Sequence, residues 1–447
     1  MSNYYSLRLI VVASAAIISY VVYKVSSDFN STSHTLPSDG WFGSGEKRAD
    51  DERILPFKVI VSEEALEASH FSYEPLEDRN DFSNGFNGEY LKHVASYWLK
   101  KYNWRYHEEI INTVPHFTTE IEGLKIHFIR AKPTQNSYQL VVPLLLLHGW
   151  PGNVFEFLKI IPKLIDPIQQ IGSDINVAFE VIAPSIPGFG WSSAPMKTGF
   201  DQEAAARIFN KLMIRLGFSR YLLQGGDWGS AIATSIAFYY PENVIGLHLN
   251  MALIFTWKAL LYEIFGAVVP RLAYSSETFH HQPAGAFLKD ILEETGYMHI
   301  QATKPDTVGA ALSDSPIGLA AYILEKFSSG TNTTYRSLHD GGLTRQFIVT
   351  SRVIMFQFKK HLIGQAYLAM HLKLSISSLF CSPYITVPTG YAAFPEDLAK
   401  QPEEIMRIMY NLTSYTEIKA GGHFAAFEEP KLLASDIIKF VKTIELH

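Results

Sequence analysis

The residues with the clearest chemical potential form the sequence Gly-Gly-Asp-Trp-Gly at positions 225–229. A strand-like run, Tyr221–Gln224, precedes it, and a helix-like stretch, Ser230–Tyr240, follows it. Glycines at both ends of such a strand–turn–helix permit a strained turn that exposes the central side chain. That side chain is Asp227, a carboxylate that is ionised at neutral pH and can attack an alkyl carbon without prior loss of a proton. The expected product is an alkyl ester on the enzyme, which a second step must hydrolyse.

Asp227 could instead do no more than cap the following helix, so its interpretation depends on partners elsewhere in the chain. Upstream, Leu144–Leu147 is typical of a buried parallel strand, and a His-Gly-Trp-Pro-Gly turn follows it at 148–152. A turn of this type supplies one backbone N–H of an oxyanion hole, and the residue after the nucleophile supplies the other. We therefore predict the backbone amides of Trp150 and Trp228 as the two donors.

A histidine and an acid follow the predicted nucleophile in the chain. A strand-like run, Tyr384–Val387, leads to Phe-Pro-Glu-Asp at 394–397, and His423 follows two glycines near the C-terminus. The order nucleophile, acid, histidine is that of the α/β-hydrolase fold. In the second step His423 would take a proton from water while a carboxylate holds the imidazole in orientation.

The chain resembles the microsomal-type epoxide hydrolases, a group that includes the insect juvenile hormone epoxide hydrolases. The resemblance runs from about Trp41 to the C-terminus and rests on six blocks in the same order, at residues 114–123, 148–152, 184–190, 225–230, 296–301 and 421–427. It implies an α/β-hydrolase fold with a mostly parallel central sheet, an inserted helical cap and an N-terminal meander. It further implies hydrolysis of epoxides to vicinal diols without a metal or cofactor.

The resemblance also implies individual site residues. Tyr297 and Tyr367, both in the cap, would polarise the epoxide oxygen and protonate the developing alkoxide, which is far more basic than a phenolate. Tyr297 lies in an uninterrupted block, whereas Tyr367 lies in a stretch, 343–381, that departs from the family pattern. Family spacing makes Asp397 the acid that orients His423. The adjacent Glu396 is the alternative, because neighbouring side chains point in different directions.

The N-terminus carries a separate signal. Leu9–Tyr23 is uncharged and mainly apolar, with Arg8 before it and Lys24 after it. At about 1.5 Å per residue the run spans roughly 22 Å, and flanking residues can extend it toward the ~30 Å of a bilayer core. A cleaved signal peptide is the competing interpretation, but apolar residues continue beyond the possible cleavage site at 13–15. We expect a retained single-pass anchor in the endoplasmic reticulum membrane, with the catalytic body in the cytosol.

Composition agrees with a large folded enzyme. The 447 residues are 47% hydrophobic and 18% charged, which supports an extensive core, and a net charge of −6 argues against a nucleic-acid partner. The single cysteine, Cys381, excludes an intramolecular disulfide. The partners expected are a small hydrophobic epoxide, water and, through the anchor, membrane lipid.

The expected organisation has four parts. Residues 1–25 form the anchor, and residues 26–132 form a linker and an N-terminal extension. The α/β-hydrolase core covers residues 124–254 and 376–447. The helical cap covers residues 255–375.

Other activities with the same elements differ at identifiable positions. Haloalkane dehalogenases also use an aspartate nucleophile, but commonly place an Asn where this chain has Trp150. A serine esterase would need Ser in place of Asp227. A binding protein that had lost turnover would not need intact Asp397, His423 and Tyr297. The identity of the epoxide stays open between xenobiotic substrates for detoxification, fatty-acid epoxides and a juvenile-hormone-like terpenoid.

Overall fold

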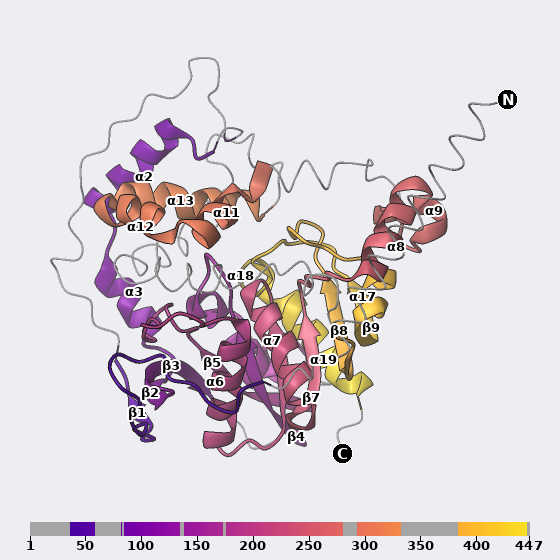
Figure 1. The fold of residues 1–447 in the computed structure, drawn as a ribbon, viewed down its shortest axis with the longest axis horizontal. Helices are drawn as coiled ribbons and strands as arrows, with labels where there is room; N and C mark the ends of the chain where they lie inside the picture. The colour runs from indigo at the N-terminus through magenta and orange to yellow at the C-terminus, as the bar shows by residue number, and fades with distance from the viewer. Residues whose placement is uncertain are drawn as a thin grey trace.

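The computed structural model describes residues 36–58, 82, 85–134, 138–172, 176–279, 293–331 and 383–444. Within these residues one nine-stranded sheet forms the centre, in the order β1-β2-β3-β5-β4-β6-β7-β8-β9 (Figure 1). Neighbours are antiparallel from β1 to β5 and parallel from β5 to β9. The strands are β1 (Leu55–Pro56), β2 (His116–Ile121), β3 (Leu124–Ala131), β4 (Leu140–Leu147), β5 (Val177–Pro184), β6 (Tyr221–Gly225), β7 (Val244–Leu249), β8 (Ile385–Ala393) and β9 (Tyr410–Glu417).

Helices flank the sheet and cover the ends of its strands (Figure 1). Several begin at a side chain that accepts a backbone N–H of the first turn, such as Asp201 before α6 and Thr256 before α8. The described α-helices are α2 (Gly88–Lys100), α3 (Trp104–Ile111), α4 (Ile161–Ile165), α5 (Pro167–Gln170), α6 (Gln202–Arg215), α7 (Trp228–Tyr239), α8 (Trp257–Val268), α9 (Pro270–Ala273), α11 (Gly296–Thr303), α12 (Pro305–Asp314), α13 (Pro316–Ser329), α17 (Glu403–Met409), α18 (Ala425–Glu428) and α19 (Pro430–Thr443). Short 3-10 helices are η2 (Val154–Leu158), η3 (Pro241–Asn243) and η4 (Glu277–Phe279).

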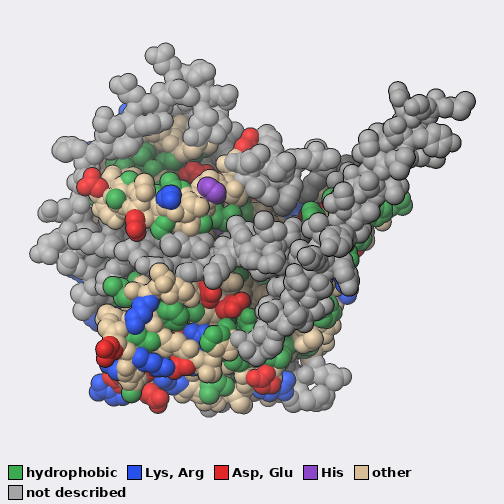
Figure 2. Space-filling view, viewed as in Figure 1, with side chains coloured by type: hydrophobic (Ala, Val, Ile, Leu, Met, Phe, Trp, Pro, Cys, Tyr) green, Lys and Arg blue, Asp and Glu red, His purple; other side chains and the backbone are tan. Residues whose placement is uncertain are grey.

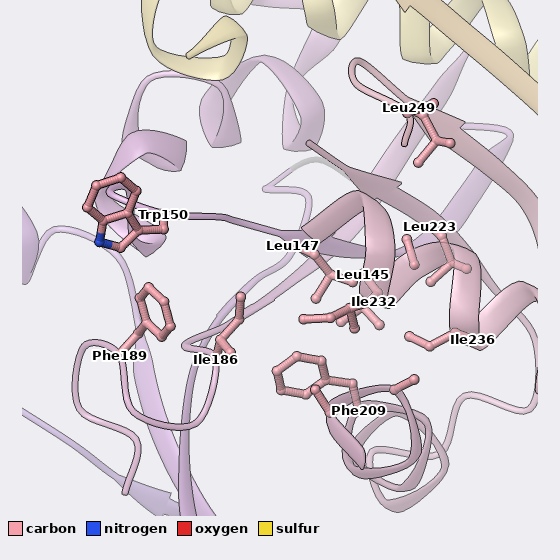
Figure 3. Close-up of a cluster of buried hydrophobic side chains, with 14 of the residues drawn as sticks. Leu145, Leu147, Trp150, Ile186, Phe189, Phe209, Leu223, Ile232, Ile236 and Leu249 are labelled. Atoms are coloured by element: carbon pink, nitrogen blue, oxygen red, sulfur yellow. The ribbon is translucent and has the colours of Figure 1, made fainter. Parts of the chain in front are cut away.

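Strand β4 shows how the sheet is buried on both faces. Leu145 and Leu147 pack into one hydrophobic cluster with residues of α6 and α7, as Figure 3 shows for Ile232 and Phe209. Leu144 and Leu146, which point to the opposite face, belong to a second cluster with residues of α4 and α19. Alternate side chains of a strand point to opposite faces, so a run of leucines serves both layers. The strand predicted at 144–147 is thus confirmed as part of a parallel sheet.

Between β7 and β8 the chain leaves the sheet and forms α8, α9, α11, α12 and α13. In Figure 1 the last three lie above α18, with α2 beside α13, and α13 contacts α2. Helices inserted at this point of a parallel sheet confirm the predicted α/β-hydrolase fold with a cap. The N-terminal meander is likewise present as the antiparallel strands β1, β2 and β3.

The turn between β2 and β3 fastens the meander to the core. Glu122 and Gly123 both have positive φ, 52° and 76°, as a tight turn of mirror-image type requires. Asp50 accepts the backbone N–H of both residues, at 2.7 and 2.9 Å. The buried Glu122 carboxylate accepts two hydrogen bonds from Arg207 of α6, at 2.8 and 2.9 Å. The buried ion pair between Glu122 and Arg207 therefore holds this strained turn against the catalytic body.

The face in Figure 2 carries two kinds of surface. Over the sheet and α6, Lys and Arg side chains lie beside Asp and Glu side chains, so charges of both signs are mixed. Over α8 and α9 hydrophobic side chains are exposed, and Leu261, Ile264 and Leu272 are 52%, 55% and 80% exposed. Among the described residues, exposed large hydrophobic side chains therefore gather on α8 and α9, the first helices after β7.

Within the described ranges no single helix has the length and hydropathy to cross a bilayer, and only α12 and α13 together reach them, with a bend of 118° between the two. The predicted anchor, residues 1–25, lies outside the described residues.

We predict that Arg207→Met lowers the free energy of unfolding by about 3 kcal/mol, because it leaves the Glu122 carboxylate buried without its main partner. The loss stays near that value because Lys211, 3.1 Å from Glu122, remains. The control is Lys92→Met, which breaks an exposed pair with Glu89 and should change stability by about 0.5 kcal/mol or less. Urea unfolding curves of the three proteins measure both effects, and equal midpoints would contradict this role of Arg207.

Candidate active site

Two glycines allow the turn that carries Asp227. A Cβ on Gly225 would lie 2.4 Å from the carbonyl oxygen of Gly229, and a Cβ on Gly229 would lie 2.2 Å from that of Leu147. Such contacts are far shorter than packing permits, so both positions require glycine. Asp227 itself has φ 50° and ψ −130°, a strained conformation for a residue with a side chain. The close contact with Leu147 brings Asp227 to the end of β4.

The side chain of Asp227 turns toward the His-Gly-Trp turn and away from its own helix. It makes no capping hydrogen bond with α7. Its Oδ1 accepts the backbone N–H of Trp150 at 2.7 Å, where one predicted oxyanion donor lies. Gly149 permits this approach, because a Cβ there would lie 2.2 Å from Oδ1. The geometry disfavours the helix-cap interpretation, while the amide of Trp228 as second donor stays a prediction.

His423 lies between two carboxylates. Its Nε2 is 3.4 Å from Asp227 Oδ2, and its Nδ1 is 3.5 Å from Asp397 Oδ1. The Asp397 side chain is fully buried, and its Oδ1 also accepts the N–H of Ala399 at 3.0 Å. Glu396 forms a backbone bridge with the residue before His423 and is held differently. The structure thus brings together the predicted nucleophile, histidine and acid, with Asp397 facing the imidazole.

The two carboxylates govern the charge of His423. Burial by itself lowers the pKa of His423, but Asp397 and Asp227 outweigh it and hold that pKa well above the usual value. The protein therefore favours the protonated form of the imidazole.

The loop that carries His423 is fixed from two sides. The N–H of His423 donates to the carbonyl of Gly330, at the end of α13, at 2.9 Å. The amides of Gly422 and Phe424 both donate to Oε1 of Glu428, at 3.2 and 3.1 Å. Burial raises the pKa of Glu428 to about 7. The position of the imidazole therefore depends on the cap as well as on the core.

Tyr297 lies in the first turn of α11, and its ring stacks on the indole of Trp150. The ring centroids are 4.5 Å apart and the planes differ by 17°. The ammonium of Lys326 is 4.8 Å from the centroid of the Tyr297 ring. Burial, and next the charge of Asp227, raise the pKa of Tyr297 above its usual value, so the hydroxyl keeps its proton at neutral pH. Tyr367, the second predicted tyrosine, lies outside the described residues.

Three further polar groups lie near these residues, and the sequence did not single them out. Tyr322 of α13 has its ring 6.0 Å from Trp150 and accepts a hydrogen bond from Gln301 at 3.2 Å. Gln301 belongs to the same sequence block as Tyr297, which was the available signal for it. Glu156 of η2 lines the cavity beside Asp227. Glu156 belongs to no sequence motif, so its place beside Asp227 is seen only in the folded structure.

His148, the first residue of the predicted turn, is part of the scaffold. It is buried, and its Nε2 accepts the N–H of Ile186 at 3.1 Å. Burial lowers the pKa of His148 to about 4, so the imidazole is neutral. It links the turn after β4 to the turn after β5, at residues 187–190. Among the described residues no group of three or more His, Cys, Asp or Glu is placed to hold a metal ion.

Comparison with known proteins identifies the family. Residues 54–157 match the family described as "Epoxide hydrolase N terminus", and residues 142–352 match "alpha/beta hydrolase fold". Epoxide hydrolase 1 of Sus scrofa is 47% identical over 96% of this chain and 98% of its own length. Juvenile hormone epoxide hydrolase 2 of Ctenocephalides felis is 39% identical over 97% of this chain and 95% of its own length.

A solved structure shows the same likeness in three dimensions. The crystal structure of juvenile hormone epoxide hydrolase from Bombyx mori superimposes with a TM-score of 0.83 at 38% identity, covering 91% of this chain and 98% of that one. Sequence and fold agree over nearly the whole length of both proteins. The chain belongs to the epoxide hydrolase family, hydrolases that act on the ether bond of an epoxide ring, and it has their α/β-hydrolase fold.

Proposed function

We propose that this epoxide hydrolase forms vicinal diols in two steps through a covalent ester on Asp227. The observation that supports this most directly is the placement of the Asp227 carboxylate. One oxygen is bound by the Trp150 amide at 2.7 Å, and the other is directed toward His423 at 3.4 Å. Oδ2 would attack an epoxide carbon while Oδ1 stays in the oxyanion site.

In the first step the epoxide oxygen must gain a proton as the C–O bond breaks. Tyr297 supports this role because its hydroxyl is held in the protonated form and its ring stacks against Trp150, next to the nucleophile. A neutral phenol is a suitable donor to an alkoxide, which is the stronger base. Tyr367 is proposed as the second donor from the family resemblance alone.

In the second step water must attack the Cγ carbon of the ester. His423 would take a proton from that water, while Asp397 orients the imidazole and the Trp150 and Trp228 amides bind the oxyanion. The tetrahedral intermediate then breaks its bond to the substrate oxygen, which receives the proton from His423. Asp227 re-forms as a carboxylic acid with one oxygen from water, and its remaining water proton passes to the neutral His423, which restores the carboxylate and the imidazolium.

Esterification itself prepares His423 for this role. The free carboxylate of Asp227 is one of the groups that hold the pKa of His423 high. An ester has no negative charge, so that contribution disappears when the intermediate forms. The pKa of His423 should then fall, so the imidazole can return its proton to the tyrosinate left by ring opening and become a base.

We also propose that residues 9–23 anchor the protein in the endoplasmic reticulum membrane. The uncharged apolar run supports this, as does the exposed apolar surface of α8 and α9, where Lys258 and Arg271 also lie. An apolar surface with adjacent cations suits contact with lipid. The substrate is proposed to be a small hydrophobic epoxide, because such compounds partition into the same membrane.

The covalent intermediate can be tested by mass spectrometry of the protein during reaction with an epoxide such as styrene oxide. His423→Gln should accumulate protein heavier by the mass of one epoxide, because alkylation survives while water activation is lost. Asp227→Ala should give no such adduct and no diol. As a further check, single turnover in oxygen-18 water should leave the label in the enzyme carboxylate and not in the diol. Normal turnover by Asp227→Ala would disprove the mechanism.

The role of Tyr297 can be tested against its neighbour Tyr322. Tyr297→Phe should slow ring opening by about 100-fold, in the range typical of general acid catalysis, and leave ester hydrolysis nearly unchanged. Tyr322→Phe is the matched control and should affect ring opening far less. Rapid-quench measurement of ester formation and decay separates the two steps. A defect in hydrolysis alone would remove Tyr297 as the proton donor.

The anchor can be tested by alkaline carbonate extraction of membranes from cells that express the protein. Native protein should stay with the membrane, whereas Ala15→Asp with Ile18→Asp should be released, because each charge at the centre of a span disfavours insertion by about 2.5–3.5 kcal/mol. Thr32→Asp with Ser33→Asp in the linker is the control and should stay bound. Release of the native protein would contradict the anchor.

A further inference from the structure

A small cavity lies beside the carboxylate of Asp227. Its volume is about 20 Å³, and its lining includes Asp227, His423, Glu156, Gln224 and Asn250. A site that holds one water molecule needs about 10–15 Å³ of such volume and two to four polar partners. The cavity therefore has the size and the polar lining for a single water molecule, between the ester-forming group and the base.

Glu156 is the part of this lining that the mechanism has not used. Its Oε1 is buried and has no hydrogen-bond partner among the described residues. The chain makes room for it, because a Cβ on Gly152 would lie 2.5 Å from Oε1. Glu428, the other buried carboxyl of the site, differs because its Oε1 accepts two backbone amides. Buried oxygens are rarely left unpaired in native structures, so Oε1 of Glu156 requires a partner from the cavity.

The charge of Glu156 fits a role beside a carboxylate. Burial raises the pKa of Glu156 to about 8, the charge of Asp227 adds to this effect, and His423 and the Gly149 amide oppose it. At neutral pH the side chain is mainly a neutral carboxylic acid, which offers both an O–H and a carbonyl oxygen to water. It also adds no second negative charge next to Asp227.

We propose that Glu156 is a positioning residue that holds the water molecule which hydrolyses the ester on Asp227. This inference rests on the proposed two-step function. The water oxygen would bond to Cγ of Asp227, one of its protons would pass to Nε2 of His423, and the other would stay hydrogen-bonded to Oε1 of Glu156. The proton on His423 then leaves with the diol oxygen, and the second water proton passes from the re-formed carboxyl of Asp227 to His423, so Glu156 itself is unchanged by the cycle.

The test measures ester formation and ester hydrolysis separately, by rapid quench and mass spectrometry with styrene oxide. Glu156→Met keeps the length of the side chain but removes its hydrogen bonds. It should slow hydrolysis by about 100-fold, as a misplaced reactant does, and leave ester formation within about threefold. Glu156→Gln should restore hydrolysis to within about fivefold, because a neutral amide offers the same donor and acceptor as a neutral acid.

Controls separate this role from a structural one. Glu263→Met changes a half-buried carboxyl on α8 that is not among the residues lining the cavity, and both steps should stay at the native rates. Melting temperatures show whether each variant is folded. If Glu156→Met does not fold, Glu156→Ala replaces it, and it too should slow ester hydrolysis while leaving ester formation nearly unchanged. A merely structural role would slow both steps together, and the glutamine variant would not restore only one of them.

The outcomes are distinguishable from failure of the two-step function. Native hydrolysis in Glu156→Met and Glu156→Ala, with an adduct still trapped in His423→Gln, would overturn the role of Glu156 alone. Equal loss of both steps in folded Glu156→Met would do the same. An adduct absent from His423→Gln as well would overturn the two-step function from which this inference starts.

Discussion

The contact between the turn after β6 and the end of β4 is the constraint on which the site depends. Gly229 can lie against the carbonyl of Leu147 only because it has no side chain. That contact forces Asp227 into a strained backbone and directs its carboxylate at the Trp150 amide. The strain is tolerated because the two strands and α7 are buried in one core, where β4 supplies leucines to both layers. The placement of the Asp227 carboxylate is therefore a product of packing.

Burial of several ionisable groups in one place raises the question of how their charges are balanced. Asp227 and Asp397 lie on either side of His423, whose cation offsets them. The other two buried carboxyls, Glu156 and Glu428, have pKa values raised to about 8 and about 7. Burial thus keeps a larger share of these two in the neutral form, and the site does not collect four negative charges around one cation. Burial therefore brings these carboxyl groups together and also shifts two of them, Glu156 and Glu428, toward the neutral form.

Much of this arrangement was predictable from the sequence, and the reason differs from element to element. The strands at Tyr221–Gly225 and Leu140–Leu147 follow from apolar runs that end in glycine-containing turns, and the order of Asp227, Asp397 and His423 follows from the fold. Family spacing favoured Asp397 over Glu396, but which of the two side chains faces the imidazole depends on how the chain turns after β8. Glu156 was not predictable, since its meaning comes from a cavity formed by segments far apart in the chain. Tyr367 and residues 1–25 lie outside the described residues, so those predictions stand untested.

A final consequence concerns the order of the two steps. A histidine that is already a base in the free enzyme would have no ester to act on, because its target forms only after alkylation. Here Asp227 and Asp397 together hold the pKa of His423 well above its usual value, so the imidazole is a cation while Asp227 is free. In the proposed mechanism, formation of the ester would remove one of those two charges, and Asp397 alone would then support the cation against the effect of burial. The base would thus be released by the reaction that creates its target, which would link the two steps.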